Sequence, residues 1–402
     1  MTYATRKPIK NTNKKIVAYD LKYDSGENAL KDMIKHLLGE GESTEKLNNA
    51  PTILEIRKEN LDSYTEEYLL MLPKDYVLIQ VNSTLLPDEN IARLIRILKE
   101  RRFKVVIEIN KEDRVFTLAK AFADIIKFDV SYIEESENIE SLRQGFIGKI
   151  LVIDVNSPED YNKISKINAD YYEGSYIDNS EIKFEVAENK HSKINFTEVI
   201  RALNEDLDPR DMAKIISRDS LLSAQIIKIS NSACYGGRTR IKNVESAIIR
   251  IGQVNVRGIL YLMEFTTCTE QVEQLLQTSY HRALFCEYIK IESKIKKLDL
   301  DEAYMIGLLS LLGVITTKPM PQALSGLGLD KKIEYALVYR EGVGGSLINF
   351  IESYESADWD RVKFYEKEFN IKEGKVFELY YKALGMVQQT WRTLRGTQNA
   401  EI

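Results

Sequence analysis

The stretch over residues 215–252, IISRDSLLSAQIIKISNSACYGGRTRIKNVESAIIRIG, decides the fold of the C-terminal half. Apolar residues recur over positions 221–229 at the three-and-four spacing of a helix, which Asp219 or Ser220 can cap and the following glycine pair can end. A second helix is predicted over 243–251, where the next glycine stops it. No strand pattern follows, so the C-terminal half is predicted to be all-helical.

Three motifs in this stretch occur in a specific order. They are SRDSLLSA, NSACYG and AIIRIG, and together they resemble the HDOD domain of bacterial signalling proteins. The resemblance implies an all-helical relative of the HD metal phosphohydrolases that has usually lost their metal ligands. Ser310 and Leu311 stand where the adjacent His and Asp would be, and His281 is the one histidine inside this domain, since His191 is only its first residue and His36 lies outside it. A single imidazole cannot assemble a di-metal centre, so His281 is interpreted as an ordinary helix residue.

Composition limits the function classes. A chain of 402 residues with 44% hydrophobic content is long enough for two domains. The net charge of −5 argues against a main surface that binds nucleic acid or anionic lipid. The chain has no apolar run of membrane-spanning length and no signal-peptide pattern, so a cytoplasmic protein is expected. The three cysteines are odd in number and widely spaced, which indicates neither a disulfide framework nor a zinc site.

Strand-like and helix-like segments alternate in the N-terminal half. Strands are predicted over 15–23, 52–57, 76–82, 104–110, 125–131, 149–156 and 171–177. Apolar strands separated by helices indicate a parallel sheet covered on both faces, and seven such units favour a (β/α) barrel. The region ends near residue 190, whereas such barrels rarely run below about 200 residues. An open or abbreviated barrel is therefore predicted.

The polar residues at the strand ends resemble those of the EAL domain of cyclic di-GMP phosphodiesterases. The segments IVAYDLKY, IQVNSTLL, VVIEIN, IIKFDVSYI, LVIDVNSPEDY and INADYYEGSYI follow one another in that family's order, and the resemblance covers about residues 15–177. The resemblance implies that the family's site positions correspond to Asp20, Asn82, Glu108, Lys127, Asp129, Asn156 and Glu173.

Several of these positions depart from the family pattern. An active EAL domain binds two divalent cations through carboxylates, and such cations need several oxygen ligands at once. The leading glutamate is Asp20, the late glutamate is Asn156, and the final glutamine is Glu173. The paired aspartates that should follow Glu108 are absent. The resemblance with these departures implies a degenerate barrel without catalytic residues, metal or other cofactor, and therefore a chain that is not an enzyme.

The predicted organisation is α/β plus all-α. Residues 1–14 form a polar N-terminal segment, 15–190 an abbreviated, degenerate EAL-like (β/α) barrel, and 191–402 an all-helical, HD-like HDOD domain with a C-terminal helical extension. A docking surface is hypothesised at Asn231, Ser232, Tyr235, Arg238 and Arg240, because exposed Tyr and Arg are favoured at binding hot spots. The alternative is that Asn231 and Ser232 only satisfy backbone groups at a helix end.

These patterns favour a signal transduction scaffold in cyclic di-GMP-related signalling that acts through protein–protein interaction. Its partners are signalling proteins of unknown identity or a second copy of the chain, and neither nucleic acid nor a membrane is expected. A cyclic di-GMP receptor without hydrolysis and a residual phosphodiesterase are the alternatives. Only Asn82, Lys127 and nearby backbone amides would meet two phosphates, so cyclic di-GMP binding is expected to be weak or absent.

Overall fold

The computed structural model describes residues 3–26, 28–38, 50–60, 62–109, 116–135, 145–176, 208–218, 220–232, 235, 239–264 and 270–398. The chain divides into two compact units. The first is Met1–Asp178 with Glu355–Trp359, and the second is Asn179–Tyr354 with Asp360–Ile402. The predicted domain boundary at residues 190 and 191 lies outside the described residues.

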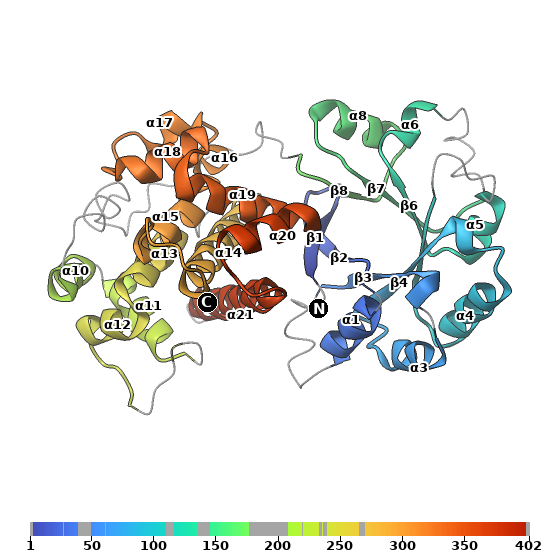
Figure 1. Ribbon diagram of the computed structural model, residues 1–402, viewed down its shortest axis with the longest axis horizontal. Helices are drawn as coiled ribbons and strands as arrows, with labels where there is room; N and C mark the ends of the chain where they lie inside the picture. The colour runs from blue at the N-terminus through green and yellow to red at the C-terminus, as the bar shows by residue number, and fades with distance from the viewer. Residues whose placement is uncertain are drawn as a thin grey trace. The chain divides into compact units, whose positions relative to one another are not determined.

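The first unit is built on a closed barrel of eight strands in chain order (Figure 1). The strands are β1 (Ala4–Asn11), β2 (Ile16–Tyr23), β3 (Thr52–Ile56), β4 (Val77–Asn82), β5 (Val105–Glu108), β6 (Ile125–Asp129), β7 (Lys149–Ile153) and β8 (Tyr171–Glu173). From β2 to β8, neighbouring strands are parallel. The seven predicted strands are all present, each within the predicted span.

The strand β1 corrects the prediction of a polar segment over residues 1–14. It runs antiparallel to β2, with Ala4 opposite Tyr23, and antiparallel to β8, with Ile9 opposite Glu173. It thereby supplies the eighth strand, so the barrel is closed and not open. Its cationic side chains are compatible with this position because the Arg6 guanidinium lies 3.9 Å from the centre of the Tyr19 ring.

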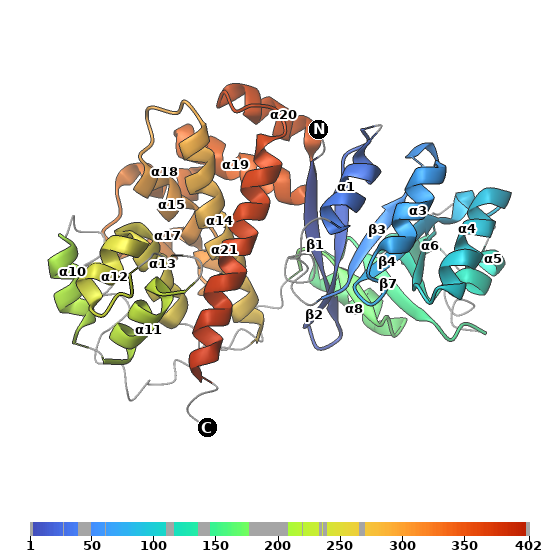
Figure 2. The ribbon, with the colours of Figure 1, turned by 90° about the horizontal axis from the view of Figure 1, so that it is seen from below.

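Helices cover the outside of the barrel, as Figures 1 and 2 show. They are α1 (Ala29–Leu38), α3 (Ser63–Met71), α4 (Glu89–Glu100), α5 (Phe116–Phe122), α6 (Tyr132–Glu135) and α8 (Pro158–Lys166), with short 3₁₀ turns at Lys58–Asn60 and Ser83–Leu85. The barrel is abbreviated because a tight hairpin, and not a helix, joins β1 to β2, and because α6 is only 4 residues long. The predicted abbreviated (β/α) barrel is confirmed.

The inside of the barrel has an apolar layer with a polar layer beside it. The apolar layer consists of Ile9, Ile53, Leu78, Val106, Ile125 and Leu151, one residue from each of six strands. Side chains alternate along a strand, so the residues two positions nearer the carboxyl ends of the parallel strands also point inward. These positions include Gln80, Glu108 and Lys127. Strand geometry therefore gathers ionic side chains at one end of the barrel, which we call the barrel mouth.

The second unit is helical throughout its described residues. Its helices are α10 (Pro209–Ile216), α11 (Ser220–Ser230), α12 (Val244–Ile251), α13 (Gln253–Glu264), α14 (Glu270–Glu292), α15 (Leu300–Leu309), α16 (Leu312–Ile315), α17 (Met320–Leu324), α18 (Lys331–Tyr339), α19 (Gly342–Ser356), α20 (Trp359–Glu368) and α21 (Lys375–Gln398). In Figure 2 the long helices α14 and α21 lie side by side. Among the helices described, none combines the length and apolar character needed to cross a bilayer.

The ends of α11 and α12 follow from their sequences. The side chain of Asn243 accepts the backbone N–H of Ser246 at 2.8 Å, and Gly252 ends α12 with a φ of 87°. The helix α11 stops at Ser230, before the glycine pair that was predicted to end it. The helix ends there because the Asn231 side-chain amide donates to the carbonyl of Ile227 at 2.9 Å, in place of the backbone N–H that would continue the helix.

The close packing of α14 against α15 predicts that a larger residue at position 307 destabilises the fold. A Cβ atom on Gly307 would lie 2.4 Å from the carbonyl oxygen of Arg282, and backbone cannot yield as a flexible side chain can. We expect Gly307→Ala to lower the free energy of unfolding by about 1–3 kcal/mol, as overpacking does. The control is Gly385→Ala in α21, where nothing lies within 4 Å and a gain of about 0.5–1 kcal/mol is expected. Urea denaturation followed by circular dichroism measures both, and equal stabilities would contradict the packing argument.

Candidate site in the barrel mouth

The ammonium group of Lys127 is the centre of the barrel mouth. Lys127 extends from β6 and has no exposed surface. Its Nζ donates to Asp20 Oδ2 at 2.5 Å and to Gln80 Oε1 at 2.8 Å, and it lies 3.5 Å from Glu108 Oε2. The Gln80 amide in turn donates to the Glu108 carboxylate. Residues from four strands thus share one buried cation.

Asp20 carries its charge in this setting. Burial alone would raise the pKa of Asp20, but the ammonium groups of Lys127 and Lys22 outweigh burial and hold that pKa well below its usual range. The Lys22 Nζ lies 2.8 Å from Asp20 Oδ2. Burial would lower the pKa of Lys22, yet Asp20 and Glu173 raise it. Asp20 and Lys22 are therefore both ionised at neutral pH.

Glu173 behaves in the opposite way. Its side chain is buried, and burial together with the charge of Asp20 raises its pKa to about 7. The charges of Lys22 and Lys127 lower this pKa, but by less than burial and Asp20 raise it. The Lys7 Nζ lies 3.9 Å from Glu173 Oε1. The Oε2 atom of Glu173 makes no hydrogen bond with the described residues. Glu173 is thus a buried acid that exchanges its proton near neutral pH.

Two predicted site residues serve local turns. Asn82 Oδ1 accepts the backbone N–H of Thr84 at 3.0 Å, and Asn156 Oδ1 accepts the backbone N–H of Ser175 at 2.8 Å. Each amide therefore fixes the loop that follows a strand and does not join the Lys127 cluster. The structure brings together Asp20, Glu108, Lys127 and Glu173 from the predicted set.

Asp129 has a partner that the sequence reading did not single out. Its Oδ1 accepts the backbone N–H of Ser131 at 2.7 Å. Burial raises the pKa of Asp154, and a hydrogen bond with Asp129 adds to the shift. Asp154 follows β7 and has a left-handed φ of 61°. The sequence could have identified Asp154 by its position, since it lies near the end of a predicted strand and two residues before Asn156.

The family resemblance implies divalent cations, which need several oxygen ligands at once. In the described part of the chain, no three Asp, Glu, His or Cys side chains lie close enough to hold a metal ion. The Lys127 ammonium already bridges Asp20 and Glu108. The described residues do not fit a metal pair. Residues 110–115, which follow β5 and include the place of the missing aspartates, lie outside the described residues.

The hypothesised docking residues of the helical unit are mostly engaged. The side-chain amide of Asn231 donates to the carbonyl of Ile241 and accepts its backbone N–H. The Ser232 hydroxyl donates to the Ile229 carbonyl at 2.7 Å. Tyr235 is half-buried, with its hydroxyl 3.5 Å from that of Tyr280. Arg240 is exposed, and Arg238 lies outside the described residues.

In the helical unit, the positions that correspond to metal ligands in HD domains lie in the hydrophobic core. His281 is buried with Nε2 3.3 Å from the Tyr380 carbonyl, and its ring packs edge-on against the Tyr380 ring. The Ser310 hydroxyl donates to the Gly307 carbonyl at 2.7 Å and accepts from Arg282 at 3.2 Å. These side chains hold helices together.

The family model described as the HDOD domain matches residues 191–335 of this chain. The helical half carries an HDOD domain. Residues 215–252, on which the sequence resemblance rested, fall inside the match, so the predicted HDOD domain is confirmed. The described helices α10 to α17 also lie within it.

Two curated relatives resemble nearly the whole chain. One is the cyclic di-GMP phosphodiesterase CdgJ of Vibrio cholerae, 20% identical over 382 residues that cover 90% of this chain and 87% of that protein. The other is the uncharacterised protein YuxH of Bacillus subtilis, 22% identical over 410 residues that cover 95% of this chain and 97% of that protein.

The N-terminal barrel resembles EAL domains of known structure. The EAL domain of Mycobacterium smegmatis DcpA is 13% identical, covers 43% of this chain and 90% of its own, and has a TM-score of 0.38. An EAL domain protein of Listeria monocytogenes is 15% identical, covers 44% of this chain and 86% of its own, and has a TM-score of 0.31. The chain combines an HDOD domain with an N-terminal barrel that resembles EAL domains.

These comparisons correct the prediction that the chain is not an enzyme. That prediction is wrong, because a relative aligned over 90% of this chain is named a phosphodiesterase. Asp20 remains a carboxylate at its strand, and Asp154 adds one beside Asp129 that the sequence argument did not count.

Proposed function

We propose that this chain binds cyclic di-GMP at the barrel mouth and takes part in cyclic di-GMP signalling through its two domains. The ligand is proposed because CdgJ, which resembles nearly the whole chain, is named a cyclic di-GMP phosphodiesterase. The name of this relative also suggests phosphodiester hydrolysis as the activity of the site. The observation that carries the site is that three lysines contact the carboxylates of the barrel mouth: Lys22 and Lys127 contact Asp20, and Lys7 contacts Glu173.

The charge state of the mouth supports binding of an anion better than the sequence suggested. Asp20 is compensated by two lysines, and Glu173, with a pKa of about 7, is partly neutral at physiological pH. The side chains of Lys7 and Lys22 are 28% and 27% exposed, so a phosphodiester can reach both.

The test is titration of the full chain with cyclic di-GMP by calorimetry. We expect Lys7→Met to weaken binding about tenfold, because one exposed charge contact to a phosphate is worth on the order of 1.4 kcal/mol. Lys104→Met is the matched control, since Lys104 is exposed just before β5 and therefore lies at the opposite end of the barrel. Equal losses in both variants, or no binding by the unaltered chain, would reject the site.

Hydrolysis is followed in the same samples by chromatography of the dinucleotide. If cyclic di-GMP is converted to its linear form and Lys7→Met slows this conversion, the barrel mouth is supported as the place of reaction. Conversion at an unchanged rate in that variant argues that the dinucleotide is bound elsewhere.

The predicted protein-docking role of the turn after Asn231 stays a prediction. Arg240 is its one described residue that is both exposed and charged. We propose that the partners of the chain are signalling proteins in the cytoplasm, and the expectation rests on the acidic composition and the unpatterned cysteines.

A further inference from the structure

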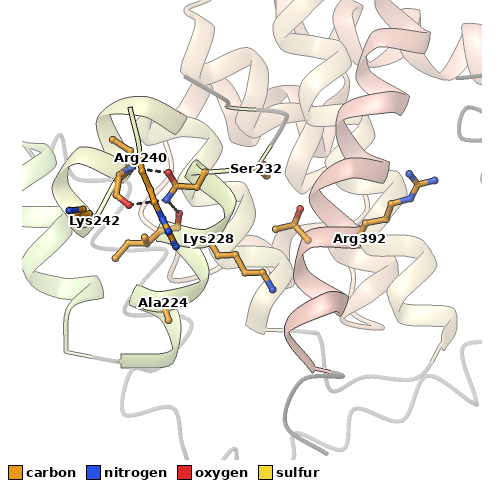
Figure 3. A pocket seen from close by; sticks show the side chains of 10 residues that line it. Ala224, Lys228, Ser232, Arg240, Lys242 and Arg392 are labelled. Atoms are coloured by element: carbon orange, nitrogen blue, oxygen red, sulfur yellow. Dashed lines mark hydrogen bonds between the residues drawn. The ribbon is translucent and has the colours of Figure 1, made fainter. Parts of the chain in front are cut away.

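A hollow of roughly 900 Å³ lies in the helical unit, between α11, the segment 240–242 and α21 (Figure 3). Its charged lining residues are Lys228, Arg240, Lys242 and Arg392, and none of the described residues that line it is acidic. This all-cationic lining contrasts with the net charge of −5 of the whole chain. The hollow belongs to the second unit alone and is separate from the barrel mouth.

The cations reach the hollow from different elements. In Figure 3, the side chains of Lys228 and Arg240 lie next to each other, and that of Lys228 extends into the space toward α21. Lys242 and Arg392 extend outward on opposite sides. Among the described residues, Lys228, Arg240 and Lys242 have no ion-pair partner, so their charge is not neutralised within the described part of this unit.

Asn231 fixes the wall that carries two of these cations. Its Nδ2 donates to the Ile241 carbonyl at 2.9 Å, and its Oδ1 accepts the Ile241 N–H at 2.8 Å. The same amide donates to Ile227 at the end of α11. Arg240 and Lys242 flank Ile241, so the motif asparagine sets the backbone from which both cations extend. Residues Ile227 and Ile241 also give the hollow an aliphatic part.

We propose that this hollow binds a phosphate ester of nucleotide size. Small-molecule sites typically enclose about 300–1,000 Å³ and combine apolar walls with a few polar groups, and the hollow matches both properties. Guanidinium and ammonium groups are the side chains that bind phosphate. An extended acidic protein segment is the less suitable occupant, because a stable protein contact needs about 800 Å² and roughly 20–30 residues on each partner, whereas ten described residues line the hollow.

The experiment is calorimetric titration of the full chain with ATP and, separately, with inorganic pyrophosphate, at near-physiological salt. We expect ATP to bind with a Kd below about 1 mM and more tightly than pyrophosphate, because the aliphatic part can contact the nucleoside. The double variant Lys228→Met, Arg240→Met should weaken ATP binding at least about tenfold. The control pair is Lys363→Met with Lys367→Met, two exposed lysines of α20, and it should bind as the unaltered chain does.

Other outcomes decide against the proposal. Absence of ATP binding, or ATP binding that the Lys228 and Arg240 changes leave intact, would overturn it. So would binding of poly-glutamate that these changes abolish while ATP does not bind, because the occupant would then be an acidic protein segment. ATP binding that Lys7→Met weakens would assign the nucleotide to the barrel mouth and also contradict the proposal.

Discussion

Lys127→Met is expected to lower the free energy of unfolding by about 3–5 kcal/mol, because it leaves a buried carboxylate without its cation. The Lys127 ammonium has no exposed surface and contacts Asp20, Gln80 and Glu108. Asp20 is itself 1% exposed, so water cannot replace the lost partner. Urea denaturation measures the change.

A surface pair on the same barrel gives the control. Lys99→Met removes the ion pair with Asp124, whose two side chains are 36% and 37% exposed, and should cost no more than about 1 kcal/mol. The double change Asp20→Asn, Lys127→Met should recover part of the stability, since the uncompensated charge is gone. If Lys127→Met costs no more than Lys99→Met, the buried network does not stabilise the barrel.

Glu173→Gln is expected to change the pH dependence of stability. The folded-state pKa of Glu173 is about 7, above its ordinary value of 4.5. A raised carboxyl pKa means that the folded state holds the proton more tightly than the unfolded state does. This contribution to stability is present below the ordinary pKa and is lost as the pH rises through about 7. Between about pH 5 and pH 8 the unaltered chain should therefore lose roughly 2–3 kcal/mol that Glu173→Gln retains.

Denaturation in urea at both pH values tests this expectation. Glu100→Gln, at the exposed end of α4, controls for the loss of one carboxylate. Glu287 of α14 also has a pKa raised to about 7 by burial, so the transition of the barrel has to be separated from that of the helical unit. Parallel pH profiles for Glu173→Gln and the unaltered chain would show that Glu173 keeps an ordinary pKa.

Strand and helix patterns in the sequence predicted most of the fold. Near-continuous apolar strands identified β2 to β8, and apolar spacing identified α11 and α12. The strand β1 was not predicted, because Arg6, Lys7 and Lys10 gave it a polar composition and Pro8 argued against a strand. Pro8 is tolerated because it faces Tyr19 of β2 and precedes the residues that pair with β8.

The candidate site was predicted less completely. Strand-end position identified Asp20, Glu108, Lys127 and Glu173, which do meet in the barrel mouth. Side-chain direction could not be read from the sequence, so the local roles of Asn82 and Asn156 were missed. The contribution of Gln80 was missed for a related reason, since a neutral side chain inside an apolar strand carries no obvious chemical signal.

The most direct test of the barrel mouth as the dinucleotide site is a calorimetric titration with cyclic di-GMP at about pH 6 and pH 8. Protonation of Glu173 removes a negative charge from the mouth, so binding of the unaltered chain should be about tenfold tighter at the lower pH. Glu173→Gln should bind at both pH values with nearly the affinity of the unaltered chain at pH 6. Affinity that does not vary with pH, or that varies equally in Glu173→Gln, would contradict binding at the barrel mouth.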